Sequence, residues 1–213
     1  MTNSEILAHI DHTVLKPDTK WEQVAQICEE ALRYHTASVC IPSYFVAKAR
    51  KTYPALNICT VIGFPIGYTP AEAKAAETRI AAENGADEID MVINVSALKD
   101  GEDAVVLEEI KAVRAACAGK ILKVIVETCY LTEDEKIRVC GLVTEGGADY
   151  IKTSTGFGTA GADLADIALF KAHIGKNVKI KAAGGIRTRE QMEAFLDAGC
   201  DRIGCSAARI LFS

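Results

Sequence analysis

The sequence predicts an α/β protein, a (β/α)8 TIM barrel that forms a single compact domain over residues 1–213. Short apolar, β-branched segments alternate eight times with segments of helical period. No proline-rich or low-complexity linker interrupts the eight units, and the length suits one well-buried core. A doubly wound open sheet is the alternative. It would want a G-x-G-x-x-G turn after the first strand, and that turn is missing.

Four strand–helix units fill the first half of the chain. Lys16-Pro17-Asp18 ends the first strand and Gly63-Phe64-Pro65 ends the third, because proline cannot donate to a strand ladder. Capping boxes that begin at Thr19 and Thr69 open two of the helices, and Gly85 ends the second of these as a C-cap. The expected strands are 9–15, 37–41, 57–62 and 88–93, and the helices begin near 19, 43, 69 and 103.

Four more units follow in the second half. Capping boxes begin at Thr132 and Thr188, and Gly199 lies near the end of the helix that Thr188 opens. The sixth strand starts at Ala148 and breaks at Gly156. The other expected strands are 120–126, 178–182 and 201–204, and the expected helices are 132 onward, 163–173, 188 onward and a short 206–212.

The composition indicates a reduced, cytoplasmic protein that acts on small molecules. A net charge of -5 argues against nucleic acid as the main partner. None of the eight cysteines forms a C-x-x-C pair, and most lie in apolar or helical runs. The N-terminus has no basic region followed by an apolar one, so no secretory signal is expected. No uninterrupted apolar window of about 18 residues exists, so no membrane partner is expected either.

Several strands carry charged residues on one face and apolar residues on the other. Since side chains alternate along a strand, the apolar faces should meet the helices and the charged faces should point into the barrel. The charged set that this alternation predicts is Glu88, Asp90, Lys123, Lys152, Lys179 and Lys181. Glu88, Lys123 and Lys179 come early in their strands, where we expect a buried ion-pair network. The other three come late, towards the face where barrel enzymes place their chemistry.

Asp90, Lys152 and Lys181 form a set suited to amine catalysis. A free lysine has a pKa of about 10.4 and is not nucleophilic at neutral pH. A second ammonium about 6 Å away costs about 2.8 kcal/mol at an effective dielectric of about 20, or about two pKa units. One amine can then be neutral and condense with a carbonyl to a Schiff base. Lys152 is the better nucleophile because it ends its strand; a structural ion pair is the alternative.

Glycine-rich turns follow the seventh and eighth strands. Loops at these two strand ends are the usual phosphate site of a barrel, where backbone N–H groups bind the dianion. Gly184 and Gly185 form the first turn, Gly204 and Ser206 the second, and Gly156 after the sixth strand could add a donor. The sequence therefore predicts a phosphorylated ligand.

The chain resembles the deoxyribose-phosphate aldolase family of class I, Schiff-base aldolases. The resemblance rests on Lys152-Thr153-Ser154-Thr155-Gly156-Phe157 and Lys181-Ala182-Ala183-Gly184-Gly185, with Glu88-Ile89-Asp90-Met91-Val92-Ile93-Asn94 and Ile10-Asp11-His12-Thr13 further upstream. It implies that Lys152 carries the Schiff base, Lys181 perturbs it and Asp90 transfers protons. It also implies that Gly156, Gly184, Gly185, Gly204 and Ser206 hold the phosphate, and that Asp11, Thr13, Cys40 and Thr155 bind the rest of the substrate.

The resemblance implies a lyase of carbohydrate degradation, in deoxyribose phosphate catabolism. The reaction is the reversible cleavage of 2-deoxy-D-ribose 5-phosphate to acetaldehyde and D-glyceraldehyde 3-phosphate, with no cofactor. No metal is expected, because the four histidines lack ligand spacing; only His12 comes near the site. Two alternatives stay open: another Schiff-base barrel lyase, transaldolase-like or dehydratase-type, and a non-catalytic sugar-phosphate-binding barrel. A homo-oligomer, dimer or tetramer, is compatible with the sequence.

The end of the chain departs from the family pattern. Members usually continue Gly-(Thr/Ala)-Ser with another Ser or Ala, a Gly and a longer tail, whereas here Ala207, Ala208 and Arg209 follow Ser206 and the sequence runs to Ser213. We expect this difference to affect phosphate affinity more than catalysis, with Arg209 as the candidate replacement contact.

Overall fold

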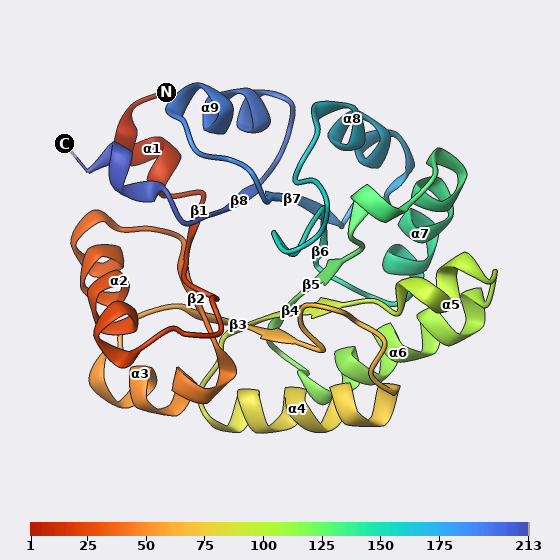
Figure 1. Ribbon diagram of the computed structural model, residues 1–213, viewed down its shortest axis with the longest axis horizontal. Coiled ribbons are helices and arrows are strands. Elements are labelled where there is room, and N and C mark those ends of the chain that lie inside the picture. Colours follow the sequence, from red (N-terminus) through yellow and green to blue (C-terminus); the bar gives the residue numbers. More distant parts are fainter. Residues whose placement is uncertain (213) are drawn as a thin grey trace.

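The computed structural model, which describes residues 1–212, is a closed barrel of eight parallel strands in chain order, with helices around the outside (Figure 1). Each strand pairs with the next, and β8 pairs with β1 to close the barrel. The strands are β1 Ile10–Thr13, β2 Ser38–Ile41, β3 Ile58–Ile62, β4 Glu88–Val92, β5 Ile121–Ile125, β6 Tyr150–Lys152, β7 Lys179–Ala183 and β8 Arg202–Cys205. The predicted barrel and all eight of its strands are confirmed.

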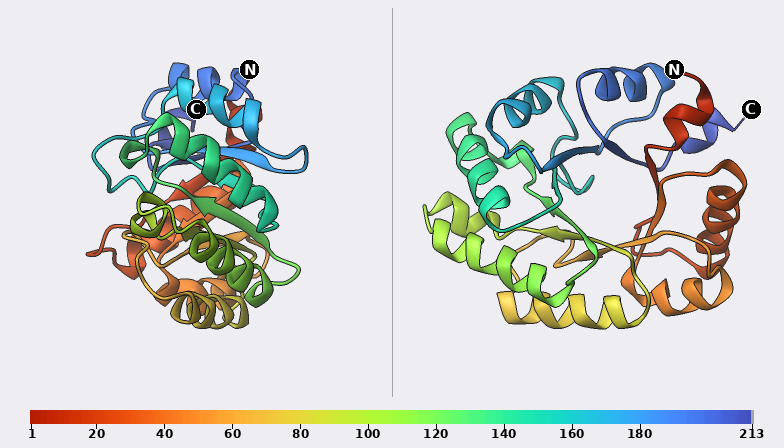
Figure 2. Two further views of the ribbon diagram at one scale, coloured as in Figure 1. Left: turned by 90° about the vertical axis from the view of Figure 1, so that its right-hand side faces the viewer. Right: turned by 180° about the vertical axis from the view of Figure 1, so that it is seen from behind.

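The helices form a continuous outer layer, which Figure 2 shows from the side and from behind. The larger ones are α2 Trp21–Tyr34, α3 Val46–Thr52, α4 Ala71–Glu83, α6 Asp103–Ala116, α7 Glu133–Glu145, α8 Leu164–His173 and α9 Arg189–Asp197. Two short helices were not predicted, α1 Asn3–Leu7 and α5 Val95–Lys99. Three 3₁₀ turns, η1 Ser43–Phe45, η2 Thr128–Tyr130 and η3 Ala208–Leu211, complete the set, and η3 replaces the short last helix.

The helix boundaries test the capping predictions. The boxes at Thr132 and Thr188 form as predicted. Those at Thr19 and Thr69 were wrong. The Thr19 N–H bonds to the Lys16 carbonyl, and this turn leaves Thr19 outside α2, which begins after Lys20. Helix α4 begins after Pro70, which has no side-chain cap.

Apolar residues fill the layer between the strands and the helices. Ile89, Met91, Leu122, Val124 and Ile151 belong to this core, as strand alternation predicts. Cys40, Cys59 and Val61 form a small separate apolar cluster inside the barrel. Charged side chains occupy much of the remaining interior, where a barrel normally has branched apolar ones.

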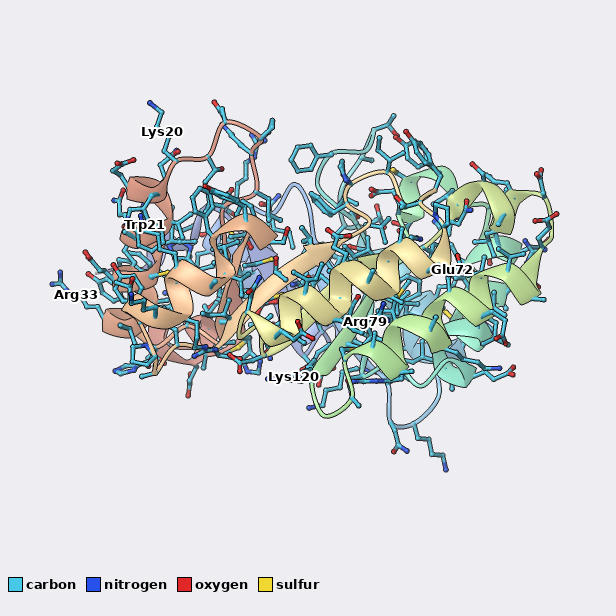
Figure 3. The ribbon with its side chains drawn as sticks, turned by 90° about the horizontal axis from the view of Figure 1, so that it is seen from below. Lys20, Trp21, Arg33, Glu72, Arg79 and Lys120 are labelled. Carbon is cyan, nitrogen blue, oxygen red and sulfur yellow. The ribbon has the colours of Figure 1, made fainter. Side chains whose placement is uncertain are left out.

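The outer surface is polar where the helices meet solvent. Lys20 and Arg33 point away from the barrel in Figure 3. Helix α1 and the turn η3 lie next to each other (Figure 1), and the Asn3 side chain donates to the Leu211 carbonyl at 3.1 Å. Within residues 1–212, none of the helices combines the length and apolar character needed to span a bilayer.

Candidate active site

Asp90 is the centre of the charged network inside the barrel. Its Oδ2 atom accepts hydrogen bonds from Nζ of Lys152 and Nζ of Lys181, each at 2.7 Å. Its Oδ1 atom accepts from Nζ of Lys123 at 2.8 Å and from the Cys59 thiol at 3.1 Å. Asp90 and Lys123 are register partners on β4 and β5, and Lys152 and Lys181 are partners on β6 and β7. The register of four consecutive strands therefore brings three lysines to one carboxylate.

A second tier of ion pairs lies beneath Asp90. Lys123 contacts Glu88 at 2.5 Å, so the predicted pairing of these two residues is confirmed. Arg202 of β8 bridges Asp11 and Glu88, with Nη1 3.1 Å from Glu88 Oε2. Lys179, predicted to join this tier, does not. It starts β7 at the open bottom of the barrel, is exposed, and lies 5.7 Å from the centre of the Tyr150 ring.

The cations of this network outnumber the carboxylates that pair with them. Lys123, Lys152, Lys181 and Arg202 form ion pairs with three carboxylates, Asp11, Glu88 and Asp90. All seven are buried, so each uncompensated charge is costly. The network favours the loss of one proton from an amine.

The pKa directions show which groups keep their charge. Burial alone would raise the pKa of Asp90, but the ammonium groups of Lys123, Lys152 and Lys181 outweigh it and hold the pKa well below its usual range. Burial would lower the pKa of Lys181, but Asp11 and Asp90 outweigh it and raise the pKa above its ordinary value. Lys181 therefore stays an ammonium, between two ionised carboxylates.

Lys152 is the member of the network that opens onto a cavity. The cavity has a volume of about 440 Å³ and lies at the C-terminal ends of the strands. Lys152 lines it, whereas Lys123, Lys181 and Asp90 are fully buried beneath. Lys152 contacts one carboxylate, Asp90, while Lys181 contacts both Asp11 and Asp90. Lys152, which has fewer carboxylate partners than Lys181, is thus the amine that a ligand in the cavity can reach.

The glycine turns that follow β6, β7 and β8 line the same cavity. All five predicted phosphate residues line it: Gly156, Gly184, Gly185, Gly204 and Ser206. Gly184 and Gly185 have φ values of 84° and 76°, a left-handed backbone that side chains disfavour. Two basic residues outside the predicted set, Lys16 and Arg187, also line the cavity. Neither residue lies on a strand, so the alternation of side chains along strands could not identify them.

The four remaining predicted residues divide into two pairs. Thr13 and Thr155 line the cavity. Asp11 is fully buried below it and bonds to Lys181, Arg202 and the Ser38 hydroxyl, the last at 2.7 Å. Cys40 is buried in the interior cluster with Cys59. Asp11 therefore belongs to the charged network, and neither Asp11 nor Cys40 lines the cavity.

With this geometry in place, comparison with known proteins identifies the family. The family model described as DeoC/LacD family aldolase matches residues 6–208. The chain belongs to this aldolase family.

Relatives of this aldolase chain cover nearly its whole length. It is 57% identical to a deoxyribose-phosphate aldolase of Clostridium botulinum (strain Alaska E43 / Type E3), over 98% of this chain and 95% of that one. It is 51% identical to a deoxyribose-phosphate aldolase of Clostridioides difficile (strain 630), over 95% and 93%. A tetrameric deoxyribose phosphate aldolase structure from Aeropyrum pernix superimposes with a TM-score of 0.91 at 29% identity, over 100% and 92%.

His12 and Arg209, which the sequence suggested as possible site residues, both lie away from the cavity. His12 is buried on the helix side of β1, with Nε2 2.7 Å from Glu30 of α2. Arg209 contacts the same carboxylate, at 2.8 and 3.0 Å. The Arg209 guanidinium is therefore paired with Glu30 and does not line the cavity. Ser213 lies outside the residues that the structure describes.

Two clusters could offer metal ligands by distance alone. Cys40, Cys59 and Asp90 form one, and Asp11, Cys59 and Glu88 form the other. The carboxylates of both clusters already accept from lysine or arginine. A cation there would have to displace these ammonium and guanidinium groups.

Proposed function

We propose that this chain is a deoxyribose-phosphate aldolase that works through a Schiff base on Lys152. It would cleave 2-deoxy-D-ribose 5-phosphate reversibly to acetaldehyde and D-glyceraldehyde 3-phosphate. The proposal rests on one observation. Lys152 belongs to a buried network in which cations outnumber the carboxylates paired with them, and it lines the same cavity as the glycine turns. The relatives at 57% and 51% identity are both deoxyribose-phosphate aldolases, which supports the same substrate.

The first step requires a neutral amine. Lys152 donates to Asp90 Oδ2 at 2.7 Å, so this carboxylate is placed to take the proton that leaves as the amine becomes nucleophilic. Lys181 donates to the same oxygen and keeps its own charge. The Lys152 amine then attacks the aldehyde carbon of the opened sugar, and loss of water gives an iminium.

Cleavage uses this iminium as an electron sink. The C3 hydroxyl loses its proton and becomes a carbonyl as the bond between C2 and C3 of the sugar breaks. The electrons of that bond move into the iminium, and an enamine remains on Lys152. Glyceraldehyde 3-phosphate leaves, the enamine carbon is reprotonated, and water releases acetaldehyde. Asp90, between Lys152 and Lys181, is the group that we propose relays these protons.

Phosphate recognition completes the proposal. Gly184, Gly185 and Gly204 bring backbone N–H groups to the cavity wall, and Ser206 adds a hydroxyl. Lys16 and Arg187 add positive charge near the same wall. The sugar phosphate would then bind with its aldehyde end towards Lys152.

The decisive assay is acetaldehyde release by the purified protein. We expect release from 2-deoxyribose 5-phosphate and none above background from fructose or sedoheptulose phosphates. Cleavage of a ketose phosphate in preference would favour a transaldolase-like lyase. Tight binding of the sugar phosphate without release would favour a non-catalytic barrel. Either result would overturn the proposed reaction.

We further propose that the domain acts in the cytoplasm as a homo-oligomer, a dimer or tetramer. The relationship to the tetrameric Aeropyrum pernix protein supports oligomerisation. Free cysteines at all eight positions fit a reducing compartment. Sedimentation velocity checks the first claim, and a monomer at micromolar concentration would contradict it.

A further inference from the structure

Glu127 is a buried carboxylate that the proposed mechanism leaves without a role. It follows β5, is 3% exposed, and has a left-handed φ of 53°, which is unusual for a residue with a side chain. Its carboxylate is not one of the three that pair with the interior cations. Such backbone strain persists where the surroundings over-determine it, often at functional sites.

Both oxygens of Glu127 bind one residue of the next strand's loop. Oε1 accepts the Thr155 N–H at 3.1 Å, and Oε2 accepts the Thr155 hydroxyl. The Thr155 hydroxyl in turn accepts the Phe157 N–H at 3.0 Å. The Thr128 N–H, next along the chain, bonds to the Thr153 carbonyl at 2.9 Å. The conformation of residues 153–157 is therefore set from the end of β5.

Gly158 closes the same contact from the other side. A Cβ atom there would lie 3.2 Å from Cδ of Glu127 and 2.8 Å from the Cys129 sulfur. The loop thus folds directly against the carboxyl group. A side chain at residue 158 would push the Glu127 carboxylate away from Thr155.

This loop also supports the glycine turn that follows β7. A Cβ on Gly184 would lie 3.4 Å from the Gly156 Cα, so the two turns touch backbone to backbone. The Ala162 N–H bonds to the Gly184 carbonyl at 3.0 Å. A shift of the loop would therefore move both Gly156 and Gly184 in the wall proposed to hold the phosphate.

We propose that Glu127 is a positioning residue for phosphate recognition, acting through Thr155 on the Gly156 and Gly184 backbone. It does not contact the reacting atoms and is not needed for imine formation. The inference rests on the proposed function, because it assumes that the substrate carries a phosphate. Glu127 should therefore favour the binding of the phosphorylated sugar over the unphosphorylated sugar.

Lys152 offers a competing route for Glu127 to act. Burial raises the pKa of the Glu127 carboxyl, against its bonds from Thr155 and the charge of Lys152. If Glu127 worked through the charge of Lys152, its removal would change imine formation itself. The test must therefore separate imine formation from phosphate binding.

The test compares two substrates and one trapping rate in Glu127→Gln, Glu127→Ala, Thr155→Val and Thr155→Ser. For Glu127→Ala and Thr155→Val we expect KM for 2-deoxyribose 5-phosphate to rise about tenfold or more, the loss expected for a misplaced hydrogen-bonded group. For unphosphorylated 2-deoxyribose, kcat/KM of Glu127→Ala should change less than about threefold; no such constancy is expected of the Thr155 variants, because Thr155 itself lines the cavity. Glu127→Gln keeps the side-chain volume, and Thr155→Ser keeps the hydroxyl, so both should recover part of the discrimination.

Two further variants serve as matched comparisons. Glu109→Gln removes another buried carboxylate, the partner of Lys74 at 2.5 Å, and should lower stability but keep the substrate ratio. Gly158→Ala should reproduce the loss of discrimination, because it displaces the Glu127 carboxylate without removing it.

Three measurements decide the outcome. Equal losses on both substrates, or slower borohydride trapping of acetaldehyde in the Glu127 variants, would overturn the positioning role. An unchanged substrate ratio in Glu127→Gln, Glu127→Ala and Gly158→Ala would overturn it as well. Failure of the proposed function is a separate result, since the unaltered protein would then release no acetaldehyde.

Discussion

Lys152 and Lys181 donate to the same atom, Oδ2 of Asp90, each at 2.7 Å. They are register partners on neighbouring strands, so the barrel itself places them together. Lys181 has a second carboxylate, Asp11, whereas Lys152 faces the cavity. The shared oxygen therefore couples the two amines, and only Lys152 of the pair lines the cavity.

Removal of Lys181 should abolish the excess of cations in the buried network. In Lys181→Met, the remaining three cations equal the three paired carboxylates in number, so a neutral amine is no longer favoured. We expect kcat/KM at pH 7 to fall about 100-fold or more, with partial recovery as the pH increases. The pH profile of kcat/KM checks this. A loss of the same size at every pH would show that Lys181 does not act through the charge of Lys152.

Asp90 should matter for stability as well as activity. In Asp90→Asn, three buried lysines lose their common carboxylate. We expect the free energy of unfolding to fall by about 3–5 kcal/mol and kcat by about 10²-fold or more. Urea titration gives the first quantity.

Glu108→Gln is the matched control for Asp90→Asn. It breaks a surface pair with Lys111 at 3.4 Å, with Glu108 71% exposed, and should change stability by less than about 1 kcal/mol. Equal effects of the two substitutions would contradict the importance assigned to the buried network.

Stability should decline in acid because of Asp11 and Asp90. Burial would raise the pKa of both carboxyls, but the neighbouring lysines outweigh it and lower the pKa in the folded state. Their stabilising contribution is complete above the unfolded pKa of about 3.9 and is lost as the pH falls further. Each carboxylate should contribute a slope of about 1.4 kcal/mol per pH unit below pH 4.

Urea titrations between pH 2 and 7 measure this slope. Asp11→Asn should have a shallower acid limb than the unaltered protein, since one of the two titrating groups is gone. Parallel curves would mean that the Asp11 carboxyl titrates alike in the folded and unfolded chains.

Gly204 should tolerate no side chain, because it packs against the network. A Cβ there would lie 3.2 Å from Cε of Lys181 and 3.0 Å from the Cβ of Ala183. Gly204→Ala should therefore displace Lys181 and lower kcat about tenfold. Gly141→Ala is the control: no atom lies within 4 Å of a Cβ at this α7 position, and alanine favours helix. Full activity in Gly204→Ala would show that Lys181 can move without loss.

The barrel and the inward lysines could be predicted because both depend on local sequence. Strand alternation alone placed Asp90, Lys152 and Lys181 on interior faces, and the register then brought them together. The register between two neighbouring strands cannot be read from the sequence of either strand alone. The sequence therefore could not show that Lys123 would contact Asp90, or that Arg202 would fill the lower tier in place of Lys179.

Glu127 illustrates the second limit of sequence reasoning. It shares the interior face with Lys123, and nothing in its pattern distinguishes a network residue from a loop anchor. Its role became visible through the two bonds to Thr155 and the left-handed backbone. The predicted caps at Thr19 and Thr69 failed because the N-cap of each helix is the next residue along the chain, Lys20 for α2 and Pro70 for α4.

Covalent trapping on Lys152 tests the central claim most directly. The protein is incubated with acetaldehyde and borohydride, digested, and analysed by mass spectrometry for a reduced N-ethyl adduct. We expect the adduct on the peptide containing Lys152, and no adduct there in Lys152→Ala, which should also lose cleavage activity. An adduct on Lys181 instead, or no adduct at all, would contradict the assignment of Lys152 as the imine-forming residue.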